Sequence, residues 1–353
     1  MQIIHEFAPS KENPRNSEGA FYRKPDGTIG FIYSRFTNGS EDFARSDLVE
    51  AVFSEDGKTY LGRERVIFTS EDFGAQNIMC PSVQRMPDGR LVLVFDVRMG
   101  PGHLTPWVFE SFDGGNTFVN GCNTLPESRY VGTENDRLVL TRDGNLILWC
   151  FEAPKQEGAY AGIGSQTQIV PLFSEDGGKS FIELDHYKME PELYCGLQEP
   201  GTVELNDGTL FTWARSTGGC QYVSRSTDGG RTYEKFVPSP VFTSPLSPMS
   251  VKKLADGRLI AVYNPIPPTK EMVEQNKGIL WSRRSPLVYR IFDGESWSEP
   301  SELEPFSETT NYCYTAIFAE KDFVLLGYCA SDTVRDGGGL NRLRVTRLEM
   351  SEL

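Results

Sequence analysis

The sequence predicts an all-β fold, a six-bladed β-propeller, because two short turn motifs alternate along the 353-residue chain. The first motif reads Ser-x-Asp-Gly, usually a second Gly, one residue, Ser or Thr, and then an aromatic residue. Its copies span residues 54–60, 111–118, 174–181 and 226–233, with a degenerate fifth at 290–297. The second motif is a hairpin signal centred on Asp26, Asp88, Asp143, Asp207 and Asp256, with a degenerate sixth at 320–322.

Both motifs have a physical basis. Asp and Ser side chains bond backbone groups two or three residues on, glycine adopts a positive φ, and the aromatic ring covers the sheet beneath. Asp-Gly between apolar runs is typical of a β-hairpin. The predicted strands that flank these hairpins include residues 91–95, 138–140, 146–149, 259–263 and 324–328. The repeat interval, roughly 50 to 65 residues, is long enough for four short strands.

The sixth unit lacks the first motif, and closure of the ring explains the difference. We expect Arg342–Glu349 to be its third strand and Gln2–Phe7, from the other end of the chain, to be its fourth. No covalent turn then joins these two strands. Residues 1–353 are therefore predicted to form a single propeller domain closed by both terminal strands.

Composition argues against several classes of function. The net charge of −14 disfavours nucleic acid or an anionic membrane as a partner. No stretch has the roughly 18 apolar residues of a membrane span, and the first residues lack the features of a signal peptide. Seven scattered cysteines without a Cys-x-x-Cys pair indicate reduced core residues. We expect a cytoplasmic protein.

Neither a metal site nor a cofactor is expected. The three histidines, at positions 5, 103 and 186, are far apart in the sequence, which disfavours a His-based metal site or a Ser-His-Asp triad. His103 lies on a Gly/Pro loop that is predicted to be either a surface loop or a substrate contact.

The hairpin spacing also predicts where a site would lie. In a propeller, the innermost strand of each blade starts at one face and the first hairpin turns at the other. Counting back eight residues from each hairpin Asp gives six equivalent positions near the axis: Glu18, Cys80, Asn135, Glu199, Pro248 and Tyr314. The second strand returns to the same face, where Arg35, Arg98 and Arg215 are expected. The Ser-x-Asp-Gly turns lie at the opposite face, so they are predicted to be structural.

Beyond these turns, nearly the whole chain resembles the sialidases (neuraminidases) and their relatives with Asp-box, or bacterial neuraminidase, repeats. Residues 198–215 are similar to the family stretch between the catalytic Glu and the second arginine of the carboxylate-binding triad, which implies these roles for Glu199 and Arg215. Residues 284–290 resemble the segment with the third arginine, here Arg284. Residues 314–317 resemble the segment with the nucleophilic tyrosine, here Tyr314.

Two parts of the family pattern differ in this chain. The first triad arginine normally lies in a Phe-Arg-Ile-Pro context, whereas residues 13–16 read Asn-Pro-Arg-Asn, so the resemblance implies Arg15 in an altered setting. The general acid normally is an Asp after a Tyr-x-x-Arg-like strand end. Here Tyr-Ser-Arg35 precedes Glu41 and Asp42. Asp42 matches best by residue type, and Glu41 and Asp47 remain alternatives.

The residue types that the resemblance implies suit a sugar with a carboxylate at its anomeric carbon. Arginines bind a carboxylate bidentately and keep their charge. A carboxylate nucleophile would repel such a substrate, whereas a neutral tyrosine activated by a glutamate would not. An aspartate then protonates the leaving oxygen and later activates water. The resemblance thus implies that Tyr314 attacks, Glu199 accepts its proton and Asp42 is the acid/base.

Other residues are expected at the same face. Tyr312, two positions before Tyr314 and on the same side of a regular strand, is an alternative nucleophile or a wall of the pocket. Arg35 and Asn135 are expected to contact substrate. Residues 134–137, which read Glu-Asn-Asp-Arg, are interpreted either as pocket lining or as a structural ion pair.

Three functions remain open on the sequence. The first is a retaining exo-glycosidase that hydrolyses a terminal acidic sugar such as sialic acid. The second is a related propeller hydrolase or lyase for another anionic sugar, such as a uronide, because different sites are built on one fold. The third is a propeller that binds carbohydrate without catalysis. The third hypothesis, which includes a scaffold role, predicts loss of the Arg, Tyr and Glu set, most of which this chain keeps. The expected partner is an acidic saccharide substrate.

Overall fold

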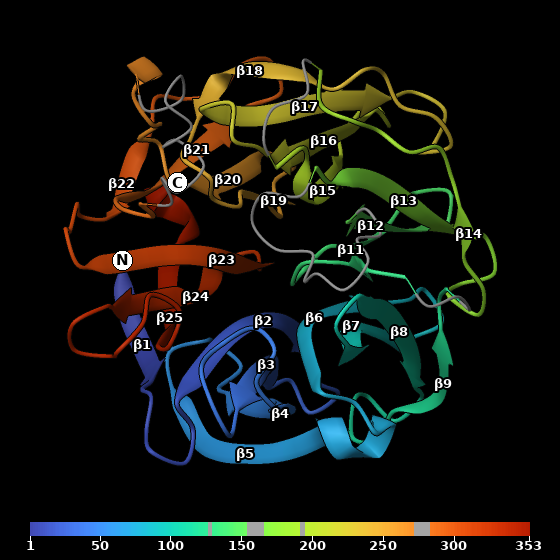
Figure 1. Cartoon of the computed structure of the whole chain (residues 1–353), viewed down its shortest axis with the longest axis vertical. Helices are drawn as coiled ribbons and strands as arrows, with labels where there is room; N and C mark the ends of the chain where they lie inside the picture. The colour runs from blue at the N-terminus through green and yellow to red at the C-terminus, as the bar shows by residue number, and fades with distance from the viewer. Residues whose placement is uncertain (126–128, 154–165, 191–194, 272–282) are drawn as a thin grey trace.

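The computed structural model describes residues 1–125, 129–153, 166–190, 195–271 and 283–353. Their strands form six antiparallel sheets around a central axis (Figure 1). Five sheets contain four strands, and the third contains five. The six-bladed β-propeller predicted from the turn motifs is therefore confirmed. Within the described ranges, no helix combines the length and the apolar character needed to cross a membrane.

From β2 to β25 the strands run through the blades in chain order, from the innermost strand of each blade outwards, and β1 is the outermost strand of the last blade. Those of the first three blades are β2 (Arg15–Arg23), β3 (Ile29–Phe36), β4 (Ser46–Phe53), β5 (Tyr60–Thr69), β6 (Asn77–Arg85), β7 (Leu91–Gly100), β8 (His103–Ser111), β9 (Val119–Asn123), β10 (Val131–Gly132), β11 (Leu138–Leu140), β12 (Leu146–Glu152), β13 (Gln168–Ser174) and β14 (Ile182–Glu183). Those of the last three are β15 (Gln198–Glu204), β16 (Leu210–Arg215), β17 (Cys220–Ser226), β18 (Val237–Thr243), β19 (Ser250–Lys253), β20 (Leu259–Tyr263), β21 (Leu287–Phe292), β22 (Ser301–Glu304), β23 (Thr310–Ala319), β24 (Phe323–Asp332), β25 (Leu343–Glu349) and β1 (Gln2–Phe7). Short 3₁₀ helices follow β5 (η1, Ser70–Phe73) and β25 (η3, Met350–Glu352).

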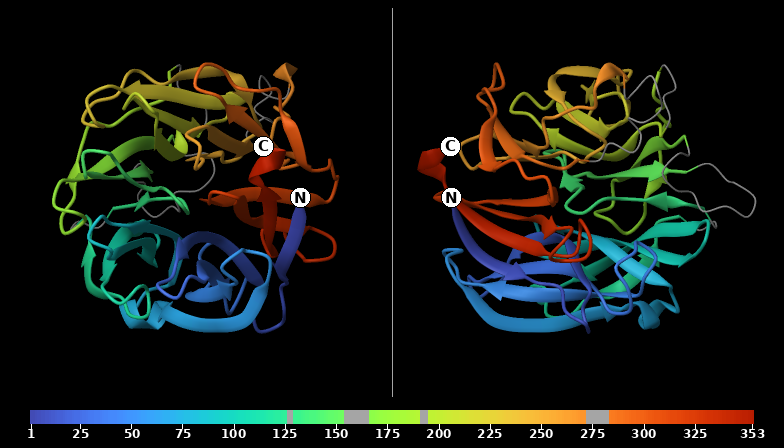
Figure 2. Two further views of the ribbon diagram at one scale, coloured as in Figure 1. Left: turned by 180° about the vertical axis from the view of Figure 1, so that it is seen from behind. Right: turned by 60° about the vertical axis from the view of Figure 1, so that its left-hand side comes forward.

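The last blade is closed by the two ends of the described chain, as expected. Strand β1 pairs antiparallel with β25, with Phe7 opposite Leu343. Figures 1 and 2 show β1 in blue beside the red strands of this blade. Glu6 also forms ion pairs with Arg342 and Arg344. The third strand of the blade begins at Leu343, one residue later than predicted.

The Ser-x-Asp-Gly turns connect the third and fourth strands of their blades. In the second copy, the hydroxyl of Ser111 donates to Asp113 Oδ1 at 2.9 Å, and the backbone N–H of Thr117 donates to the same oxygen at 2.9 Å. Hydrogen bonds from Thr117 lower the pKa of Asp113 to about 2. Gly115 has φ +93°, and a Cβ there would lie 2.4 Å from the Tyr22 hydroxyl. The turn is thus a local hydrogen-bonded unit packed against the neighbouring blade.

The hydrophobic core lies between the blades. Six clusters of buried side chains each join two neighbouring blades around the ring. In the cluster between the last and first blades, the ring of Phe7 packs 4.7 Å from that of Tyr33 and 5.6 Å from that of Tyr60, centroid to centroid. Strand β1 therefore closes the ring with an apolar contact as well as with backbone pairing.

We predict that Phe7→Ala lowers the free energy of unfolding by about 3–5 kcal/mol, because it removes a buried aromatic ring from this cluster. Ile3→Ala is the matched control, since Ile3 lies on the same strand and its side chain is 49% exposed. That substitution should change stability by less than about 0.5 kcal/mol. Urea denaturation measures both values. Equal stability of the two variants would contradict a structural role for the closure.

Candidate functional site

In five blades, a non-glycine residue in the innermost strand, or between its two parts in the third blade, adopts the left-handed region. These residues are Glu18 (φ 35°), Cys80 (φ 58°), Asp136 (φ 59°), Glu199 (φ 46°) and Tyr314 (φ 59°). Four of them are the positions predicted from the hairpin spacing. In the third blade the left-handed residue is Asp136 and not Asn135, because the innermost strand is split there into β10 and β11, which both pair with β12.

A β-bulge surrounds the left-handed residue in β2, β6, β15 and β23. Pairing with the second strand shifts at Glu18, between Ser17 and Gly19, and at the equivalent places in the other three strands. A bulge interrupts the alternation of side chains and redirects the extra residue. Each left-handed conformation costs about 1–3 kcal/mol, so packing and hydrogen bonds around the axis must hold it in place.

Glu199 and Tyr314, 115 residues apart, meet at the axis. The Tyr314 hydroxyl donates to Glu199 Oε1 at 3.1 Å. Arg215 forms a short ion pair with the same carboxylate oxygen, and its Nη1 lies 3.5 Å from the Tyr314 hydroxyl. All three residues are buried. The structure therefore brings together a phenol, a carboxylate and a guanidinium that the hairpin register assigned to one face.

Arg284 lies against the same tyrosine. Its guanidinium carbon is 4.9 Å from the centroid of the Tyr314 ring, and its Nη1 donates to Cys313 Sγ at 3.2 Å. The backbone carbonyl of Arg284 accepts a hydrogen bond from the N–H of Tyr312 at 2.7 Å. Because Arg284 is bonded to β23 through both backbone and side chain, its position depends on the start of the strand that contains Tyr314.

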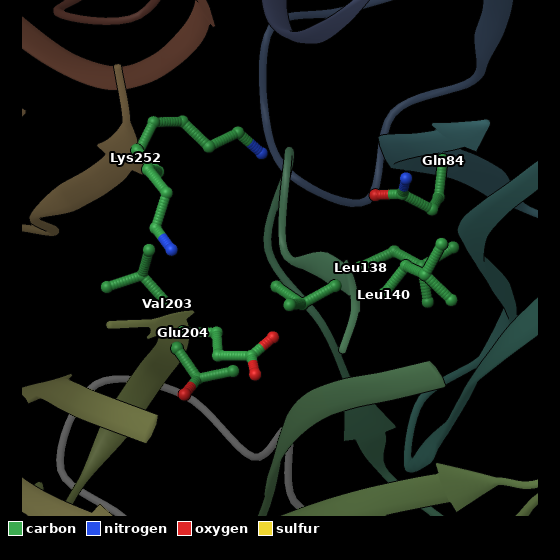
Figure 3. A pocket seen from close by; sticks show the side chains of 9 residues that line it. Gln84, Leu138, Leu140, Val203, Glu204 and Lys252 are labelled. Carbon is green, nitrogen blue, oxygen red and sulfur yellow. The ribbon is translucent and has the colours of Figure 1, made fainter. Parts of the chain in front are cut away.

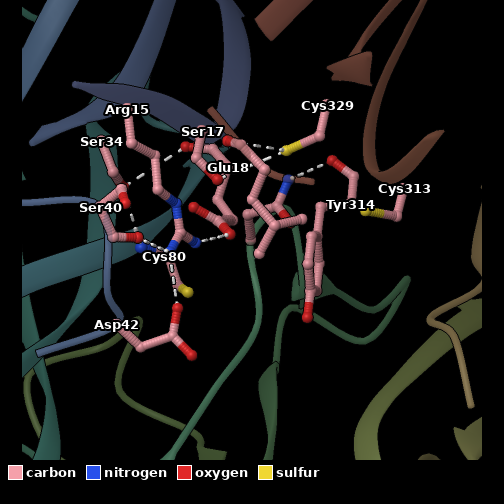
Figure 4. A network of polar contacts seen from close by, with 12 residues as sticks. Arg15, Ser17, Glu18, Ser34, Ser40, Asp42, Cys80, Cys313, Tyr314 and Cys329 are labelled. Atoms are coloured by element: carbon pink, nitrogen blue, oxygen red, sulfur yellow. Dashed lines mark hydrogen bonds and ion pairs between the residues drawn. The ribbon is translucent and has the colours of Figure 1, made fainter. Parts of the chain in front are cut away.

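Arg15 approaches from the first blade between two carboxylates. Its Nη2 contacts Glu18 Oε1 at 2.7 Å, and its Nη1 contacts Asp42 Oδ1 at 2.6 Å (Figure 4). Nη1 also donates to the carbonyl of Ser40 at 3.1 Å, and the guanidinium lies over the Phe36 ring at 4.4 Å. Glu18 is buried, whereas the Asp42 side chain is 60% exposed. The Arg15 guanidinium thus has one buried partner, Glu18, and one exposed partner, Asp42.

Asn135 connects three blades at the axis. Its side-chain amide donates to the carbonyl of Gly19 at 2.7 Å and to that of Tyr314 at 3.3 Å. The two acceptors lie in the bulges of β2 and β23. Asn135 therefore supports the backbone at Gly19 and Tyr314. Its expected contact with substrate stays a prediction.

The pKa shifts follow from burial and from the arginines. Burial raises the pKa of Tyr314 well above its usual value, and the positive charges of Arg284 and Arg215 offset this only in part. The phenol is therefore protonated at neutral pH. The surrounding protein raises the pKa of Asp42, but the charge and hydrogen bond of Arg15 outweigh that effect, so the net pKa is lowered.

Some predicted residues lie elsewhere. Arg35 pairs with Asp47 at 3.8 Å and with Glu64 at 3.7 Å, toward the outer strands of the first blade. It faces this side because neighbouring residues of β3 alternate, and Phe36 is the one that faces Arg15. The ring of Tyr312 belongs to the core cluster between the fifth and sixth blades. The bulge in β23 separates it from Tyr314, which packs with Cys313 and Cys329.

A separate cavity of about 260 Å³ lies at the hairpin ends of the innermost strands (Figure 3). It is lined by Gln84, Leu138, Val139, Leu140, Thr202, Val203, Glu204, Lys252 and Lys253. Strand β15 connects this cavity with the site around Tyr314. Glu199 is near the start of the strand, and Glu204, which lines the cavity, ends it about 16 Å farther along. Lys252, which lines this cavity, forms an ion pair with Asp136 at 2.7 Å.

The sequence did not reveal Cys313 as a partner of Arg284. A cysteine in a strand is usually a small apolar core residue, and no spacing rule distinguishes one that accepts a hydrogen bond. Glu18 was placed on the axial ring, but its contact with Arg15 was not predicted. Its position three residues after an arginine at a strand start was the available signal, and the bulge that turns the two side chains together has no signature in the sequence.

Comparison with known proteins assigns the family. Residues 47–328, well over half of the chain, match the BNR repeat-like domain. The chain belongs to this family and has the sialidase-like form of the propeller. No curated protein matches the sequence.

Several solved structures share the fold at low identity. A protein of unknown function from Dyadobacter fermentans is 16% identical, with 99% of this chain and 97% of that one aligned and a TM-score of 0.75. The intramolecular trans-sialidase of Ruminococcus gnavus, solved with oseltamivir carboxylate, is 12% identical, with 100% and 98% aligned and a TM-score of 0.73. The Hadza microbial sialidase Hz136 is 15% identical, with 97% and 67% aligned and a TM-score of 0.73. At such identities the likeness establishes the fold alone.

We predict that loss of either partner of Arg15 lowers the free energy of unfolding by a different amount. Glu18→Ala should lower the free energy of unfolding by about 3 kcal/mol, because it removes the buried partner of a buried charge. Asp42→Ala is the control, and it should cost less than about 1 kcal/mol because the side chain is exposed. Urea denaturation at neutral pH measures both. If the two variants are equally stable, Glu18 is not the residue that compensates Arg15.

Proposed function

We propose that this protein is an exo-glycosidase that removes a terminal acidic sugar, such as a sialic acid, with retention of configuration. The observation that supports this function is the hydrogen bond between Tyr314 and Glu199 beside Arg215 and Arg284. A buried phenol bonded to a carboxylate is suited to attack once the carboxylate accepts its proton. The sialidases among the solved structures that share this fold are consistent with the proposal.

In this reaction Tyr314 Oη attacks the anomeric carbon while Glu199 accepts the phenolic proton. The bond between that carbon and the leaving oxygen breaks as the new bond forms, which gives a covalent glycosyl–tyrosine intermediate. Water then attacks the same carbon and the tyrosine leaves, so the configuration is retained after two inversions. The positive charges of Arg215 and Arg284 lower the cost of negative charge on the phenol.

The substrate carboxylate is bound by Arg15, Arg215 and Arg284 in this proposal. Guanidinium groups give charge-assisted, bidentate hydrogen bonds to a carboxylate. In the structure, Arg15 contacts the carboxylate of Asp42. A substrate carboxylate would take the place of Asp42 on Arg15, and the released side chain would be free to protonate the leaving oxygen.

The Asp42 contact also favours a second candidate. An aspartate whose pKa is lowered by an arginine is a poor proton donor while the contact lasts. A propeller that cleaves a uronide by β-elimination needs a base and an arginine for the carboxylate, and Tyr314 with Glu199 would provide the base. Hydrolysis of a sialoside and elimination from a uronide give different products, so activity distinguishes them.

We predict that Tyr314→Phe abolishes turnover of a fluorogenic sialoside and leaves binding of an acidic-sugar analogue nearly unchanged, because only an interaction made in the transition state is lost. Tyr312→Phe is the matched control on the same strand and should keep most of the activity. Rates and affinities are measured side by side. A fluorinated sialic acid should label Tyr314, and Glu199→Gln should slow the labelling.

Two outcomes would contradict the sialidase mechanism. Full activity in Tyr314→Phe would exclude the tyrosine as nucleophile. Unsaturated products from a uronide panel, together with no release from the sialoside, would favour elimination. Binding of both sugar classes without turnover by the native protein would indicate a carbohydrate-binding propeller.

A further inference from the structure

The three arginines of the site differ in the partners that hold them. Arg15 contacts the carboxylates of Glu18 and Asp42. Arg215 contacts the carboxylate of Glu199. The side-chain hydrogen bond of Arg284, by contrast, goes to a thiol, Cys313 Sγ, at 3.2 Å. Among the described contacts, Arg284 thus lacks the hydrogen-bonded carboxylate partner that Arg15 and Arg215 each have.

Cys313 is placed by the fold to bond this arginine. It directly precedes Tyr314 and lies opposite Cys329 in the pairing of β23 with β24. Cys313 is buried, so its contact with Arg284 is shielded from water. The same guanidinium lies over the Tyr314 ring. Two neighbouring residues of β23 therefore position Arg284. Cys313 accepts a hydrogen bond from its guanidinium, and the ring of Tyr314 packs against the same group.

We propose that Cys313 is a positioning residue that orients Arg284 for the carboxylate of an acidic sugar. The proposal rests on the function proposed above and adds the reason why a thiol occupies this place. A carboxylate here would form an ion pair with Arg284 and compete with the substrate carboxylate. An alanine would leave the guanidinium without this bond in a buried setting, where an unsatisfied polar group is costly.

The charge state of Cys313 agrees with the contact. Burial raises the pKa of a thiol, but the hydrogen bond from Cys329 and the positive charge of Arg284 lower the pKa of Cys313 below its usual value. Cys329 has the opposite shift, since its hydrogen bond with Cys313 and its burial raise its pKa. The hydrogen bond between the two cysteines and the charge of Arg284 thus shift their pKa values in opposite directions.

Cys329 provides the matched control. It is buried in the same cluster, contacts Ser17 Oγ at 3.4 Å and the carbonyl of Leu340 at 3.9 Å, and is hydrogen-bonded to Cys313. Cys329→Ala removes a thiol of the same size and depth without removing the acceptor of Arg284. Cys313→Ser keeps an acceptor, and Cys313→Ala removes it.

The first experiment measures binding of an unsaturated sialic acid analogue by calorimetry. Cys313→Ala should weaken the Kd by roughly tenfold, the loss expected when a hydrogen bond to a charged group is removed. Cys313→Ser and Cys329→Ala should stay within about threefold of the native protein. Native affinity in Cys313→Ala, or an equal loss in Cys329→Ala, would overturn the proposal and leave the proposed function standing.

A second measurement does not depend on the ligand. The ultraviolet absorbance of the thiolate is followed against pH in the native protein and in Arg284→Gln, and Cys313→Ala identifies the signal of Cys313. Without the arginine, that signal should titrate at a higher pH. An unchanged titration would overturn the proposal. If the titration shifts as expected but the native protein binds no acidic sugar, the contact stands and the proposed function fails.

Discussion

The site depends on one backbone feature, the left-handed residue in the bulge near the start of the innermost strands. An uninterrupted strand would alternate its side chains between the two neighbouring blades and send none of them along the axis. The bulge breaks this alternation at the same level in several blades. Glu199 and Tyr314 then meet, although they come from different blades. Repetition of the blade around the axis thus brings equivalent positions of different blades close together. The residue type at each position determines the chemistry of the site.

The strain of these conformations is offset by the contacts they create. Glu18 bonds Arg15, Glu199 bonds Arg215, and Asn135 bonds the backbone at Tyr314. Each contact involves a residue with a left-handed backbone conformation, and two of the contacts also pair a buried arginine. Removing one partner would leave a buried polar group unsatisfied, so conformation and charge pairing stabilise each other. The same interactions that keep the axis folded therefore also fix the geometry of the arginines.

The fold and much of the site were predictable because both depend on distance from a hairpin. Strand β11 coincides with the predicted residues 138–140 and β20 with 259–263, since Asp-Gly turns fix the strand ends. Residues such as Arg215 and Tyr314 were placed by counting from those turns. The same counting did not place Arg35 correctly. The number of residues from a turn gives the position of a residue along its strand, but it does not show which side of the sheet the side chain faces. Tyr312 and Tyr314 were expected on one side, and the bulge between Cys313 and Ala316 separates them.

The chain as a whole is acidic, whereas three arginines gather at the site. The protein has 49 acidic and 35 basic residues, which disfavours the approach of an acidic glycan at long range. At physiological ionic strength, however, such interactions are screened beyond roughly 8 Å, while buried groups are screened much less. A carboxylate near the axis would therefore respond mainly to Arg15, Arg215 and Arg284. Arg15 and Arg215 form ion pairs with carboxylates, whereas the side-chain hydrogen bond of Arg284 goes to a thiol, so under our proposal Arg284 would contribute most to binding an anion.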